Sequence, residues 1–219
     1  MIKNRKLLKI ISLFGVVGVV FYFMHVIFGG IFYEGYNPIS QAISDLTAIN
    51  SPSKSIASIF SFLYGVFNVT FCIVLYFYLK GKISKLITIG SCFFLVMSFI
   101  SFIGYTLFPL SEAGYAGTFQ DKMHMLVTVF VVIFTIIAII LFCIGFLKTS
   151  NYKCLGIVSL ITFVLLLLGA MLINILPKEY FGIAERINVY SIVVYIGILS
   201  IWLYKNINKK TMGALHSKR

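Results

Sequence analysis

Six long stretches of this chain contain no Asp, Glu, Lys or Arg, and they constrain the fold more than any other feature. They cover residues 10–33, 55–79, 86–111, 123–147, 154–177 and 187–204. A helix needs roughly 20 apolar residues to cross a hydrocarbon layer about 30 Å thick, so each stretch is long enough to cross it. Because 60% of the 219 residues are hydrophobic, a water-soluble core is not expected.

The sequence therefore predicts an all-α, polytopic membrane protein, with a single domain over residues 1–219. We expect its six transmembrane helices at about residues 10–33, 55–79, 86–110, 123–147, 154–177 and 187–204. The first stretch follows a basic segment, as in a signal peptide, but it is too long and no small-residue cleavage site follows it. We expect it to be retained as the first helix.

The charged residues between the stretches are sorted by sign. The two ends of the chain and the loops at 80–85 and 148–153 hold fourteen basic residues and no acid: Lys3, Arg5, Lys6, Lys9, Lys80, Lys82, Lys85, Lys148, Lys153, Lys205, Lys209, Lys210, Lys218 and Arg219. The other three segments hold all six acids, which are Glu34, Asp45, Glu112, Asp121, Glu179 and Glu185, beside only four basic residues. Basic loops resist translocation, so the sequence predicts a multi-pass protein of the cell membrane with both termini cytoplasmic.

The net charge of +12 does not indicate a nucleic-acid partner, because the basic residues form short clusters beside the predicted helices. Membrane lipids with anionic head groups are the expected partners of such clusters. The short loops leave no room for a soluble catalytic domain. Any chemistry is therefore expected in the bundle and its outer loops.

The first outer loop has the pattern of a short amphipathic helix over residues 38–49. At 100° per residue its apolar side chains fall on one face, and these are Ile39, Ala42, Ile43, Leu46 and Ile49. Ser44 and Asp45 fall on the opposite face, and Pro38 suits the first helical position. We expect this helix at the outer surface, with Ser44 and Asp45 turned toward the bundle.

Seven polar residues are predicted to lie at one depth, near the outer third of the membrane. Asp121 and His124 are three apart and share a helical face. Imidazoles, carboxylates, a hydroxyl and a guanidinium together could bind a metal or perform general acid–base chemistry, with Ser44 as a candidate nucleophile. The sequence does not say whether a metal or other cofactor is bound. The predicted pocket comprises His25, Ser44, Asp45, Asp121, His124, Glu185 and Arg186.

A purely structural role is the alternative for the same residues. Asp121 and Glu185 precede or open helices that start on the outer side, where a carboxylate caps free N–H groups and is stabilised by the helix dipole. Arg186 could extend to lipid phosphates. His25 lies inside an apolar stretch, where an ionisable side chain usually faces the bundle interior, but a neutral ring bonded to a neighbouring carbonyl would also suffice.

Several of these elements occur in order in a known family. The run from Asn37 to Ala48, which contains Ile43-Ser44-Asp45, is followed by Ser51-Pro52. With His25, Phe108-Pro109, His124, Gly182 and Glu185-Arg186, this chain resembles the domain-of-unknown-function 998 family of six-helix prokaryotic membrane proteins. The Ile-Ser-Asp element is also similar to the DRAM-like and Frag-type membrane proteins, a branch of which acts in lipid remodelling. The resemblance implies the six-helix fold and points to the same polar positions, but it implies no established reaction.

Three classes of function follow from these observations. The first is an enzyme, such as a hydrolase or transferase, or a binding protein for a lipid or another small amphiphile, with its site open to the outer leaflet. The second is a non-catalytic sensor, immunity or assembly protein. A transporter is less favoured, because the predicted helices carry no charge near the middle of the membrane.

Overall fold

The computed structural model describes residues 5–207 of the chain, and within this range it is helical and contains no strand. Six helices are long and apolar enough to cross a membrane, which confirms the predicted fold class. The α-helices are α1 (Arg5–Ser12), α2 (Phe14–Ile31), α3 (Lys54–Leu79), α4 (Lys85–Leu107), α5 (Phe119–Leu147), α6 (Lys153–Ile175) and α7 (Phe181–Asn206). The short 3-10 helices are η1 (Ser44–Thr47), η2 (Ser150–Tyr152) and η3 (Lys178–Tyr180).

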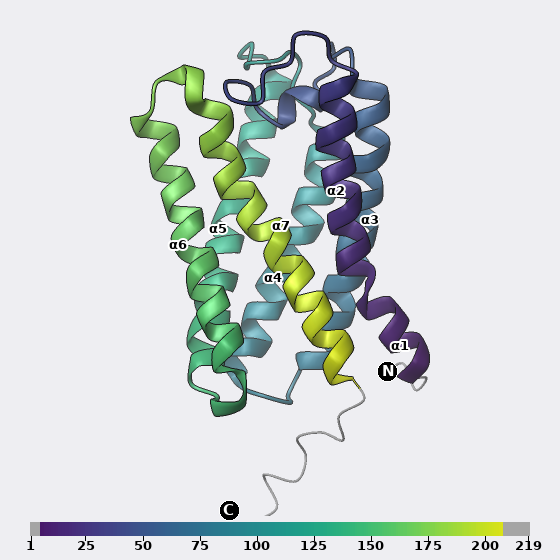
Figure 1. The fold of residues 1–219 in the computed structure, drawn as a ribbon, viewed down its shortest axis with the longest axis vertical. Helices are drawn as coiled ribbons and strands as arrows, with labels where there is room; N and C mark the ends of the chain where they lie inside the picture. The colour runs from purple at the N-terminus through teal and green to yellow at the C-terminus, as the bar shows by residue number, and fades with distance from the viewer. Residues whose placement is uncertain (1–4, 208–219) are drawn as a thin grey trace, which may run out of the picture.

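The helices run antiparallel, with α2 packed on α3, α4 on α5 and α6 on α7 (Figure 1). The loops 32–53, 108–118 and 176–180 gather at one end of the bundle, at the top of Figure 1, and we call this the acidic end. The loops 80–84 and 148–152 lie at the other, basic end, with the start of α1 and the end of α7. Helix α7 starts beside α6 at the acidic end and crosses the bundle toward α1 and α3 at the basic end (Figure 1).

The first membrane span is broken between α1 and α2 by a side chain from α7. The Ser200 hydroxyl donates to the Ser12 carbonyl (2.6 Å) and accepts from the Val16 amide (3.1 Å). These are the two groups that would bond to each other in a continuous helix, so the inserted hydroxyl explains the break. Gly15 makes room for it, since a Cβ there would lie 2.7 Å from Ser200 Cβ.

Two helices begin earlier at the acidic end than the charge-free stretches predict. Helix α5 starts at Phe119 because Thr118 and Asp121 form a capping box, in which each side chain accepts from the backbone N–H of the other. Helix α7 starts at Phe181, so Glu185 and Arg186 lie within the helix and do not precede it. Helix α4 ends at Leu107, ahead of Pro109, which cannot supply a backbone N–H.

The prediction of an amphipathic helix over residues 38–49 is wrong. Only η1 is helical there, and the residues before it form turns. The reason is that the backbone groups of this loop bond to side chains and to distant segments in place of the i−4 carbonyl. Asn37 Oδ1, for example, accepts from the Ile39 amide (3.0 Å), and the Ile39 carbonyl accepts from the Ile183 amide of α7 (3.1 Å).

We expect Gly169→Ala to destabilise the α6–α7 hairpin. A Cβ at Gly169 would lie 2.6 Å from the Asn188 amide nitrogen and 2.9 Å from the Ala184 carbonyl oxygen, and backbone atoms of a helix cannot move aside without moving the helix. Overpacking of this kind costs about 1–3 kcal/mol, which thermal unfolding in detergent would detect. Gly18→Ala is the control, because the nearest atom to its Cβ would be 3.5 Å away. Equal melting temperatures for the two variants would contradict the close approach.

Candidate functional site

Arg186 of α7 holds the first loop against the bundle. Its Nη1 donates to the Gln41 carbonyl and to the Gly182 carbonyl, both at 2.9 Å. Its Nη2 donates to the Tyr36 hydroxyl at 2.6 Å, and that hydroxyl donates to the Ala42 carbonyl at 2.8 Å. Burial raises the pKa of Tyr36 to about 12, although Arg186 opposes the shift, so the hydroxyl keeps its proton and its donor role. The guanidinium therefore fixes both ends of the segment from Tyr36 to Ala42.

Glu185, the residue before Arg186, holds the next part of the same loop. Its carboxylate accepts from the Ile43 amide at 2.7 Å. Gly182 lets the loop approach α7 this closely, because a Cβ at this position would lie 2.5 Å from the carbonyl oxygens of both Pro38 and Gln41. The pair of charged residues thus binds backbone groups and ties the first loop to α7.

Asp45 connects the first loop to the second. It is buried, and its two carboxylate oxygens accept from the amides of Ala42 and Gly114, each at 3.0 Å. Backbone bonds extend this connection, since the Ile49 amide donates to the Leu110 carbonyl at 2.7 Å. The two loops therefore form one layer over the acidic end of the bundle.

Asp121 fastens the second loop to the start of α5. Its carboxylate accepts from the amide and hydroxyl of Ser111 (2.7–2.9 Å) and from the amide and hydroxyl of Thr118 (3.0 Å each). Four donors on one buried carboxylate leave it little capacity for a ligand. The capping role that the sequence offered as an alternative is what the geometry shows for Asp121.

The two histidines also bond to the backbone. His25, 4% exposed, has Nδ1 at 3.0 Å from the Ala57 carbonyl of α3. His124, 7% exposed, has Nδ1 at 2.8 Å from the Phe108 carbonyl. A carbonyl only accepts, so Nδ1 carries the hydrogen in both rings, and Nε2 is the acceptor when the ring is neutral.

The hydrogen bonds of these predicted residues run mostly to backbone groups of the two loops. Asp45, Glu185 and Arg186 all bond to the loop 36–45, while Asp121 and His124 hold the second loop. The Ser44 carbonyl accepts from the Thr47 hydroxyl, and no bond within residues 5–207 joins its own hydroxyl to a histidine or an acid. In the same described range no three His, Cys, Asp or Glu side chains are placed so that they could share a metal ion.

Aromatic residues of the acidic half are functional candidates that the sequence reasoning missed. The Tyr22 ring lies 5.9 Å from His25 and 6.3 Å from Tyr190 between ring centroids, and Tyr105 lies 4.9 Å from His124. Tyr190 also interacts with the Arg186 guanidinium. Two sequence spacings were available as signals, because Arg186 and Tyr190 are four apart on α7, and Tyr22 and His25 are three apart on α2, so each pair shares a helical face.

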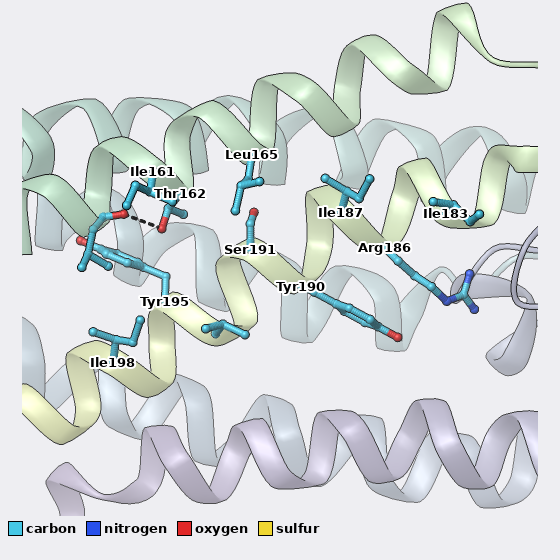
Figure 2. A pocket seen from close by; sticks show the side chains of 12 residues that line it. Ile161, Thr162, Leu165, Ile183, Arg186, Ile187, Tyr190, Ser191, Tyr195 and Ile198 are labelled. Atoms are coloured by element: carbon cyan, nitrogen blue, oxygen red, sulfur yellow. Dashed lines mark hydrogen bonds between the residues drawn. The ribbon is translucent and has the colours of Figure 1, made fainter.

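The two loops and the charged side chains that hold them form what we call the polar layer. A groove lies between α6 and α7, beside this layer (Figure 2). Its volume is about 580 Å³ and its walls are almost wholly apolar. Leu165 of α6 and Ser191 of α7 point toward each other across it, and Arg186, its one charged residue, lies at the acidic end with the guanidinium directed to the first loop (Figure 2). The lining comprises Val158, Ile161, Thr162, Leu165, Ile183, Arg186, Ile187, Tyr190, Ser191, Val194, Tyr195 and Ile198.

Comparison with known proteins gives a family. Residues 16–202 match the model of the family described as "Protein of unknown function (DUF998)". The chain belongs to this family. No curated protein matches the chain, and no solved structure matches it. The match covers four of the six membrane spans in full and most of the first and last, together with the residues of the polar layer.

We expect Arg186→Lys to release the first loop while leaving the helices folded. A lysine ammonium cannot reproduce the planar fork that reaches the Gln41 carbonyl, the Gly182 carbonyl and the Tyr36 hydroxyl together. Hydrogen exchange of the peptide covering residues 36–43 should become faster, and the protein should lose about 1.5–3 kcal/mol of stability. Lys178→Gln, an exposed charge change nearby, should alter neither. Unchanged exchange in Arg186→Lys would show that the clamp does not hold the loop.

Proposed function

We propose that this protein binds a membrane amphiphile, with an apolar chain in the α6–α7 groove and an anionic head group beside Arg186. The observation that carries the proposal is an apolar groove of about 580 Å³ that ends at a single arginine. This volume lies within the usual range of small-molecule sites, about 300–1,000 Å³. A lipid or related amphiphile of the leaflet at the acidic end matches this combination of apolar walls and one cation.

The hydrogen bonds of Arg186 support the position of the head group. A guanidinium has five N–H donors, and three are engaged with Gln41, Gly182 and Tyr36. Tyr190 also interacts with the guanidinium, so a phosphate or carboxylate oxygen would share the remaining donors with it. Such charge-assisted bonds are stronger than neutral ones. The Tyr190 hydroxyl lies on the same side of α7 and adds a second polar contact (Figure 2).

The hydrogen bonds of the three acids support binding better than catalysis. Asp45, Asp121 and Glu185 each accept hydrogen bonds from loop backbone, and a general base or metal ligand needs free lone pairs directed at a ligand. The polar layer then has a structural task, which is to fasten the two loops. The groove beside it is the part of the acidic end that is shaped for a ligand.

The charge distribution supports an orientation in the cell membrane with the basic end in the cytoplasm. A cysteine at Glu112, exposed in the second loop, should react with an impermeant maleimide in intact cells, in a background without the four native cysteines. A cysteine at Ser150, exposed at the basic end, should react only after permeabilisation. The reverse pattern would exclude this orientation, and with it an outer-leaflet site.

Filling the groove should displace the amphiphile. Leu165 is 37% exposed and points into the groove, so the larger, mostly apolar ring in Leu165→Trp should occupy it (Figure 2). We expect a photoactivatable fatty-acyl phospholipid to label this variant at least about fivefold less than the native protein. A fivefold loss of affinity corresponds to about 1 kcal/mol of binding free energy. Peptide mapping should place the native label at residues 158–165 and 183–198.

Val129→Trp is a matched control for this experiment. Val129 is exposed on α5 and, like Leu165, lies ten residues, or about 15 Å, from the acidic end of its helix. Labelling of this variant should equal that of the native protein. Equal loss in both tryptophan variants, or no loss in either, would overturn the proposal.

A further inference from the structure

A second groove lies between the same two helices, at the basic end. Its volume is about 370 Å³, and no part of the polar layer contributes to it. Helix α6 and the turn before it form one wall, and the last turns of α7 form the other. The lining comprises Asn151, Tyr152, Cys154, Leu155, Ile198, Ile201, Trp202 and Lys205.

The two grooves lie end to end along the line where α6 and α7 face each other, which we call the seam. Ile198 lines both of them. On α7 the residues at 187, 190, 194, 198, 201 and 205 follow the three- and four-residue spacing of a single helical face. Arg186 and Lys205, the cations at the two ends, are nineteen residues apart, or about 28 Å along the helix, close to the thickness of the hydrocarbon layer.

The seam offers no polar track by which a head group could pass from one end to the other. The Thr162 hydroxyl donates to the Val158 carbonyl of its own helix, and the Ser191 hydroxyl donates to the Asn188 carbonyl (2.9 and 2.6 Å). A charged head group moved along this seam would lose its hydration without gaining partners, which is costly in a membrane. The geometry therefore fits two separate sites, one for each leaflet.

We propose that the basic-end groove binds an anionic phospholipid of the adjacent leaflet, with its phosphate at Lys205 and its acyl chains along Leu155, Ile198 and Ile201. Lys205 and Asn151 are both exposed at the mouth and supply N–H donors. Charge complementarity favours an anionic head, because the segments of residues 5–207 at this end carry nine basic residues and no acid.

The aromatic wall of the groove supports this occupant. The Trp202 ring lies 5.6 Å from Tyr152 and 6.1 Å from Phe146, so its position is fixed by packing. Tryptophan at the boundary between hydrocarbon and head groups is typical of membrane proteins. Two other lysines of this end, Lys9 and Lys82, lie over tyrosine rings, at 4.4 and 4.0 Å from the centroids, whereas Lys205 opens onto the groove.

The test compares binding of phosphatidylglycerol and phosphatidylcholine by native mass spectrometry of the full chain. We expect preferential retention of phosphatidylglycerol, and Lys205→Gln should raise its dissociation constant about fivefold. Lys205→Arg, which keeps the charge, should stay within about twofold of the native value. Lys148→Gln removes an exposed charge at the same end, outside the groove, and should have no comparable effect.

A second pair of variants tests the groove itself. Ile201→Trp should fill it and reduce retention of phosphatidylglycerol, whereas Ile157→Trp, exposed on α6 outside the lining, should not. Equal retention in Lys205→Gln and Lys148→Gln, or in Ile201→Trp and Ile157→Trp, would overturn the proposal. So would equal binding of the two lipids. The acidic-end proposal is independent, because Leu165→Trp should leave binding at Lys205 unchanged.

Discussion

The acidic end of this protein depends on backbone hydrogen bonds to charged side chains. The loop that contains residues 36–45 has little regular structure, and its residues Ala42, Ile43 and Asp45 are buried. Arg186 satisfies carbonyls, and Glu185 and Asp45 satisfy amides. Leaving such groups unpaired costs about 1–3 kcal/mol each, which explains why ionisable residues are retained beside a membrane. The same interactions determine where the first loop lies relative to α7.

The α6–α7 hairpin shows how small residues and the crossing of α7 create a groove. Near the acidic end Gly169 brings α6 into backbone contact with α7 at Ala184 and Asn188. Farther along, α7 turns across the bundle toward α1 and α3 and diverges from α6 (Figure 1). Apolar side chains line the space that opens, and lipid chains are the solvent that surrounds it. The grooves therefore follow from the crossing of two packed helices and need no separate cofactor-binding motif.

The sequence predicted the six membrane helices because the length of a segment without charged residues can be read directly from it. It failed at residues 38–49, where the apolar spacing is helical but partners more than 140 positions away satisfy the backbone, as the Ile43–Glu185 bond does. The early starts of α5 and α7 are a separate case. The capping box of Thr118 and Asp121 could have been read from the sequence, whereas the start of α7 before Glu185 and Arg186 carries no such motif.

The hydrogen-bond partners of the candidate residues could not be predicted from the sequence. A carboxylate near a helix start can cap it, bind a metal or hold a loop, and only the three-dimensional positions of the donors decide. For Asp121 these donors are Ser111 and Thr118, and for Asp45 they include Gly114 of the other loop. No periodicity in the sequence encodes a contact between two irregular loops. Tyr105, the aromatic neighbour of His124, comes from another helix for the same reason, whereas Tyr22 and His25 are three residues apart on α2.

Arg186 has two roles, because it holds the first loop in place and it lines the groove of the proposed binding site. Its guanidinium fixes the loop through Gln41 and Tyr36, and its side chain also closes the acidic end of the α6–α7 groove. An anionic head group at this position would bond to donors of the same planar fork, so the occupant of the groove and the first loop share one residue. Lys205 at the other end has no such second task, because it lies exposed at the mouth of its groove. The two proposed sites therefore differ in kind: binding at Arg186 would be linked to the position of a loop, whereas binding at Lys205 would depend on charge and on the apolar walls alone.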